Sequence, residues 1–105
     1  MVVDVSGLGS NIELSGFKDI DEAAMAVLRR IVQSYVKRFD ELCYSFEKLS
    51  LKMKKVHVQV HSEKYEIHAL VIDKGRAYAS TTTDKDLFAA LDAALKKVEH
   101  ELGDK

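Results

Sequence analysis

The last quarter of the chain has the hydrophobic pattern of one amphipathic helix. Across residues 84–102, apolar side chains recur three and four positions apart, which is the spacing of a single buried stripe. The stripe consists of Leu87, Phe88, Leu91, Ala94, Leu95, Val98 and Leu102. Thr83 stands three positions before Asp86, the spacing of a weak capping box, and Asp84 adds charge where the helix dipole favours it. Gly103 is expected to end the helix in a left-handed conformation.

An earlier segment, residues 18–42, has the same helical period. Its apolar stripe consists of Ala24, Leu28, Ile31, Val32, Tyr35 and Phe39. Asp19 and Glu22 have the three-residue spacing of a capping box near its start. We therefore expect helices near residues 19–41 and 84–102, each with one side facing a shared core.

Between these helical segments, apolar and polar residues alternate, which is the period of a half-buried β-strand. In residues 48–54 the alternating apolar side chains are Leu49, Leu51 and Met53. Val56, Val58 and Val60 continue the alternation with the opposite parity. This change of parity predicts a β-bulge near Lys54 and Lys55.

Further strands are predicted at residues 11–16, 64–72 and 76–83. The sequence DKG at residues 73–75 predicts a turn with glycine at a position of positive φ. The element order is thus βαβββα. It predicts an α+β fold of two layers, with two helices on one face of a mainly antiparallel four-stranded sheet.

The sheet face that the helices leave open is expected to carry Lys48, Lys52 and Lys54, whose role the sequence leaves undecided. Near the end of the strand at 64–72, apolar side chains point to both faces. A solitary two-layer domain needs only one apolar sheet face. We therefore expect a homodimer, formed through the open sheet face or an edge strand.

Length and composition predict one compact domain. The chain has 105 residues, of which 47% are apolar and 31% charged, as in soluble globular proteins. We expect a single domain over residues 1–105, with a flexible lead at 1–10 and the folded part at 11–102. No apolar run approaches the ~20 residues that span a bilayer, and the N-terminus lacks a signal-peptide pattern. We therefore expect no membrane partner and a cytoplasmic location, and the single cysteine permits no internal disulfide.

Charge is unevenly distributed along the chain, although the net charge is only −1. Residues 28–61 hold eight basic and three acidic residues, whereas residues 1–27 hold one basic and five acidic residues. A segregated basic region suits a polyanion such as RNA, because each phosphate contact responds to the local potential. An ordinary solvated surface is the alternative that charge alone leaves open.

The sequence offers little support for catalysis or metal binding. Cys43 follows an apolar helix end, where an isolated cysteine is usually a small buried hydrophobe. His57 and His61 are four apart, which in a strand is ~13 Å, too far for one metal ion. His68 lies within an apolar strand and is expected to be held by hydrogen bonds. We expect no enzymatic activity, no metal and no cofactor.

The segments YEIHALVIDKGRAYAS and DKDLFAALDAALKKVEHEL, together with the element order, resemble the ribosome hibernation-promoting factor family. That family includes the ribosome-associated translation inhibitors. Its helix-opening pattern of acid, aliphatic, aromatic, two alanines, aliphatic and acid is matched by Asp86, Leu87, Phe88, Ala89, Ala90, Leu91 and Asp92. The resemblance spans roughly residues 11–102.

The resemblance implies a small non-enzymatic domain with a fold like that of double-stranded-RNA-binding domains. Members of the family bind ribosomal RNA of the small ribosomal subunit, in the channel for messenger and transfer RNA, and silence translation while ribosomes are idle. They use basic residues on both helices. The corresponding residues here are Arg29, Arg30, Lys37 and Arg38 in the first helix and Lys96 and Lys97 in the second.

Helical geometry adds His100 to this set. At 100° per residue, Lys96 and His100 lie opposite the stripe of their helix, and Arg29, Arg30 and Lys37 opposite that of theirs. One departure from the family is the C-terminus, where the chain has Glu101 and Asp104 in place of a basic stretch, with Asp92 and Glu99 also on the polar side. A homodimeric interaction module that keeps the fold without RNA binding is therefore the alternative function.

Overall fold

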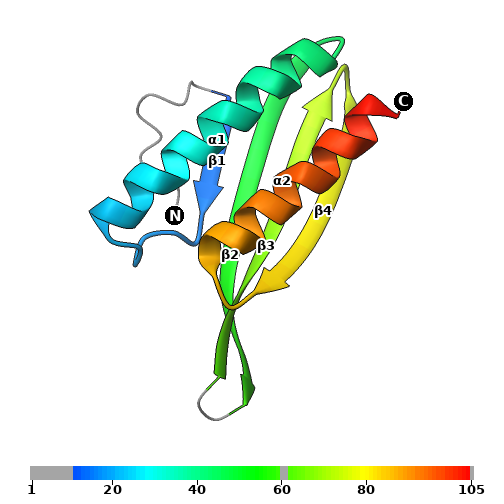
Figure 1. Cartoon of the computed structure of the whole chain (residues 1–105). Helices are drawn as coiled ribbons and strands as arrows, with labels where there is room; N and C mark the ends of the chain where they lie inside the picture. The colour runs from blue at the N-terminus through cyan, green and yellow to red at the C-terminus, as the bar shows by residue number, and fades with distance from the viewer. Residues whose placement is uncertain (1–10, 60–61, 105) are drawn as a thin grey trace.

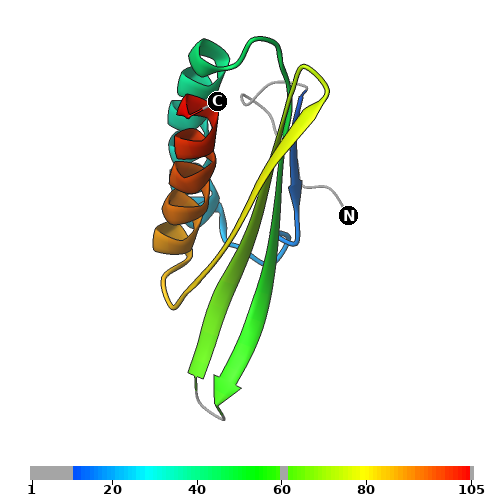
Figure 2. The ribbon, with the colours of Figure 1, turned by 90° about the vertical axis from the view of Figure 1, so that its right-hand side faces the viewer.

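The computed structural model describes residues 11–59 and 62–104 of the chain. Six elements follow one another: β1 (Ile12–Ser15), α1 (Glu22–Leu42), β2 (Phe46–Gln59), β3 (Ser62–Asp73), β4 (Arg76–Asp84) and α2 (Leu87–Gly103). The strands form one sheet in the order β1-β2-β3-β4, in which β1 and β2 are parallel and the other pairs antiparallel. Both helices cover the same face of the sheet (Figures 1 and 2). The predicted two-layer α+β fold is therefore confirmed.

The core lies between the helices and the sheet. Both predicted helical stripes are buried there, together with the alternating residues of β2 and of β3. Its largest fully buried side chains are Phe17, Phe39, Ile12, Leu14, Leu28, Leu49, Leu51, Ile67, Leu91, Leu95, Leu102 and Val32. Three of the predicted stripe residues, Ala24, Ile31 and Phe88, are only partly buried, and Met25 is buried at the start of α1 although it was not predicted.

Both helices begin at a different residue from the one predicted. Asp21 caps α1 by accepting a hydrogen bond from the Ala24 N–H at 2.8 Å, so Asp19 is not the cap. Asp86 caps α2, and its carboxylate accepts from the Phe88 N–H at 2.9 Å. The helix cannot start at residue 84, because β4 stays extended and paired with β3 through Asp84.

The end of α2 also differs from the prediction, because Gly103 is a residue of the helix and does not have positive φ. The N–H of Asp104 donates to the His100 carbonyl oxygen at 3.1 Å, which continues the helical pattern. A left-handed residue is therefore not needed to close the helix. The turn between β3 and β4 is as predicted, since Lys74 and Gly75 both have positive φ, at 51° and 81°.

The predicted bulge near Lys54 and Lys55 is absent. Pairing of β2 with β3 is regular from Lys48 to His57, and the register shifts lie outside that stretch. The β2–β3 hairpin projects beyond the helices (Figures 1 and 2). No helix covers the part of the hairpin that projects. The residues on its helix side therefore need not be apolar there. Lys55 accordingly takes the helix-side position next after Met53 and forms an ion pair with Glu63 at 3.6 Å.

Some predictions concern residues outside the described part of the chain. These are the flexible lead at 1–10, Val60 and His61. Of the helices in residues 11–59 and 62–104, none combines the length and the apolar character that a membrane crossing requires.

Candidate nucleic-acid interface

The two helices lie side by side, and two polar contacts join them. The Tyr35 hydroxyl donates a hydrogen bond of 2.7 Å to the carboxylate of Asp92. One turn further along α1 and two turns further along α2, the Arg38 guanidinium donates to the carboxylate of Glu99 at 3.3 Å. Both acids of the polar side of α2 therefore turn toward α1.

Arg38 is held in place by several neighbours. Its guanidinium also donates to the Ser34 hydroxyl at 3.3 Å and lies over the Tyr35 ring, 4.6 Å from the centroid. The hydrogen bond with Glu99 raises the pKa of the guanidinium above its usual value. Its charge is thus compensated within the chain, and a phosphate would have to compete with Glu99 for it.

Tyr35 takes part in both the core and this polar contact. Its ring is buried with Phe39, at 6.0 Å between centroids, while its hydroxyl reaches Asp92. Burial, reinforced by the hydrogen bond to Asp92, raises the pKa of the phenol to about 12. The sequence identified Tyr35 only as a core residue, because its partner lies 57 positions away and leaves no local signal.

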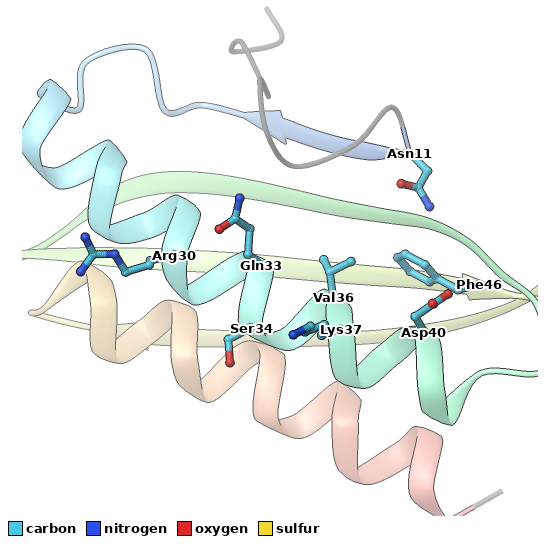
Figure 3. Close-up of a pocket in the computed structure, with 8 residues that line it drawn as sticks. All are labelled: Asn11, Arg30, Gln33, Ser34, Val36, Lys37, Asp40 and Phe46. Atoms are coloured by element: carbon cyan, nitrogen blue, oxygen red, sulfur yellow. The ribbon is translucent and has the colours of Figure 1, made fainter.

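The outer face of α1 carries Arg30 and Lys37. They are seven residues apart, which places them two turns apart on one side of the helix, about 10 Å along its axis. Figure 3 shows both beside an open groove along α1. The groove is lined by Asn11, Arg30, Gln33, Ser34, Val36, Lys37, Asp40 and Phe46. The groove is open, and six of these eight residues are polar or charged, so it suits a chain of charged groups better than a small apolar ligand.

The outer face of α2 carries Lys96 and His100, one turn apart and both exposed. Lys97 points elsewhere, since its Nζ donates to the Thr81 carbonyl oxygen of β4 at 3.5 Å. It therefore lies on the flank of α2 that is turned away from α1.

Arg29 lies on the opposite flank of the helix pair. It is nine residues from Arg38, which corresponds to half a turn, and Arg38 faces α2. Its side chain is only 30% exposed and forms an ion pair with Glu22 at 3.7 Å. The expectation that Arg29 lies opposite the apolar stripe is therefore wrong.

Of the seven residues predicted from the sequence, four share the outward side of the helix layer: Arg30, Lys37, Lys96 and His100. Arg29 and Lys97 occupy the two outer flanks, and Arg38 lies between the helices, paired with Glu99. The outward side thus has exposed basic residues on each helix. Between the two helices lie the acids Asp92 and Glu99, each already bonded to a residue of α1.

Histidine, cysteine and acidic side chains are the remaining candidates for chemistry. Within residues 11–59 and 62–104, no three His, Cys, Asp or Glu side chains gather as a metal site would require. Both ring nitrogens of His68 have partners, Glu66 at 2.9 Å and Thr81 at 3.2 Å, which confirms that hydrogen bonds hold this residue.

Known structures show where this fold occurs. The chain is similar to the N-terminal domain of Protein Y from Thermus thermophilus, with a TM-score of 0.58 and 20% identity over 89% of this chain and 92% of that one. It is also similar to a ribosomal subunit interface protein from Coxiella burnetii, with a TM-score of 0.57 and 16% identity over 90% and 92%. The sequence matches no protein-family model and no curated protein. At such identities the likeness establishes the fold.

Proposed function

We propose that this chain is a cytoplasmic, non-enzymatic factor that binds ribosomal RNA of the small ribosomal subunit and silences translation or protects idle ribosomes. The observation that carries the proposal is the fold, shared over about nine-tenths of both chains with a protein described as a ribosomal subunit interface protein. The sequence resemblance in the last strand and helix points the same way.

The RNA-binding surface in this proposal is the outward side of α1 and α2. Arg30, Lys37 and Lys96 are exposed there, and within the described part of the chain none of them forms an ion pair. Such basic side chains contact phosphates without first breaking an internal ion pair. His100 adds a hydrogen-bond donor beside Lys96.

The number of basic side chains without an internal ion pair sets the expected strength of RNA binding. Each phosphate contact contributes about 0.7 to 0.9 to the slope of log K against log salt. Three such basic side chains give a slope of log K against log salt of roughly −2 to −3, which corresponds to modest, salt-dependent binding. Arg38 is not counted, because Glu99 already compensates its charge.

Cosedimentation with ribosomes at two salt concentrations tests the proposal. The variant Arg30→Glu with Lys37→Glu reverses both bases on the outer face of α1, and neither residue is in the core. We expect it to lose most of the binding that the parent shows at low salt. A matched control, Lys52→Glu with Lys54→Glu, makes the same change on the open sheet face and should bind as the parent does.

Two results would contradict the proposal. If the helix variant and the control bind equally well, the helix layer is not the interface. If only the control loses binding, the RNA-binding surface is the sheet face.

The alternative is a homodimeric interaction module that keeps the fold without binding RNA. Two observations favour it: Leu70 and Ile72 are half-buried on the sheet face that no helix covers, and the acids Asp92 and Glu99 lie at the centre of the helix layer. Failure of the parent chain to cosediment at low salt would decide for this alternative.

A further inference from the structure

The outer edge of β4 has few of the features that normally protect an edge strand. Natural edges carry charges, prolines or bulges that discourage pairing with another chain. Here the strand pairs with β3 in unbroken register along its whole length, and residues 77–83 (AYASTTT) contain no charge and no proline. Figure 2 looks onto this edge, and no other described element lies along it.

The backbone groups that face outward from β4 can be assigned. A two-residue turn makes its flanking residues, Asp73 and Arg76, a hydrogen-bonded pair, and such pairs alternate along an antiparallel ladder. The odd-numbered residues therefore turn their N–H and C=O away from β3. They are Ala77, Ala79, Thr81 and Thr83. The contact of Lys97 with the Thr81 carbonyl oxygen agrees with this assignment.

We propose that β4 pairs antiparallel with β4 of a second copy of this chain, so that two sheets join into one. In this register Ser80 faces Ser80 of the second copy. Ala79 then faces Thr81, Ala77 faces Thr83, and Arg76 faces Asp84 of the second copy.

Three features select this register. It overlaps the full length of the strand, whose central residue is Ser80. It brings outward-facing residues opposite outward-facing residues, which allows about eight backbone hydrogen bonds. It also places Arg76 opposite Asp84 twice, once at each end of the interface. These are non-hydrogen-bonded pairs, in which facing side chains come closest.

The surrounding structure is compatible with the joined sheet. α2 packs over β3 and β4, so two copies of α2 on the same face would lie about 10 Å apart, which is a normal helix-packing distance. The hydroxyls of Ser80 and Thr82 already donate to α2 carbonyl oxygens at 2.7 and 2.6 Å, so the junction leaves neither unsatisfied. Lys97 must move aside, and its contact is long and exposed.

Charge reversal tests the register directly by light scattering. The parent should show twice the monomer mass of 11.8 kDa. Arg76→Asp places two carboxylates at each end, and Asp84→Arg places two guanidinium groups there. Each variant alone should associate at least about tenfold more weakly. An equimolar mixture restores both pairs in a heterodimer and should recover the parent mass.

Controls separate this interface from loss of folding and from other surfaces. Lys54→Asp makes a comparable charge reversal away from the edge and should leave the mass unchanged. Ala79→Pro removes only an outward N–H, so it should give a folded monomer by circular dichroism. A parent mass of 11.8 kDa at high concentration would overturn the proposal, as would a dimer that none of the β4 variants weakens. Neither result bears on ribosome binding.

Discussion

Replacing Glu99 by glutamine is expected to strengthen RNA binding, although it alters no residue proposed to touch RNA. Glu99 holds the Arg38 guanidinium at 3.3 Å and compensates its charge. Glutamine keeps the size of the side chain and removes the negative charge. Arg38 stays positioned by Ser34 and the Tyr35 ring, between the outer faces of the two helices, and becomes available to a phosphate.

The size of the effect follows from counterion release. One additional phosphate contact makes the slope of log K against log salt steeper by about 0.7 to 0.9. At about 0.1 M salt this corresponds to an affinity roughly five to eight times higher. Folding stability should change little, because the ion pair is partly solvent-exposed and such pairs contribute weakly.

The measurement is a salt titration of binding to ribosomes or to a fragment of small-subunit RNA. Glu13→Gln is the matched control, since Glu13 pairs with Lys48 at 3.2 Å on the open sheet face and its loss changes the net charge equally. We expect a steeper slope for Glu99→Gln and the parent slope for Glu13→Gln. Equal slopes for both variants and the parent would refute the idea that the Arg38–Glu99 pair limits binding.

Two further predictions concern folding and titration. Gly16→Ala should destabilise the fold far more than Gly75→Ala, as measured by urea unfolding. Both glycines have positive φ, but a Cβ at Gly16 would collide with the Met53 carbonyl oxygen, whereas one at Gly75 meets nothing within 4 Å and should cost only about 1–2 kcal/mol. The folded-state pKa of Tyr35, about 12, lies above the ordinary 10.0, so its contribution to stability is complete below pH 10 and is lost as pH rises through 12. Spectrophotometric titration should therefore show the most alkaline tyrosinate step missing in Tyr35→Phe, and superimposable curves at the alkaline end would contradict this.

Features that depend on a local period could be predicted from the sequence. The stripes of both helices, the alternation in β2 and the turn at Gly75 each arise from residues that are neighbours on a single element. Burying these stripes against one sheet face leaves few arrangements, so the two-layer fold followed from the pattern.

Features that depend on competition between neighbours could not be predicted in the same way. Asp19 and Asp21 are both near the start of α1, and in the structure it is Asp21 whose carboxylate accepts from the Ala24 N–H. Lys55 takes a helix-side position only because the β2–β3 hairpin extends beyond the helices. In both cases the outcome depends on the surrounding structure and not on the local pattern alone.

The sequence alone determined which residues are basic and on which helix they lie. Tertiary packing decided which of these basic residues are available. The packing of α1 against α2 brings Arg38 to Glu99 across 61 positions, and the packing of α2 on the sheet turns Lys97 toward β4. Likewise, the sequence shows an uncharged strand at 77–83, and only the strand order makes it an edge. The effect of a charged side chain on a ligand depends on the groups around it. Contacts between residues far apart in the sequence determine those groups, and the local hydrophobic pattern does not show such contacts.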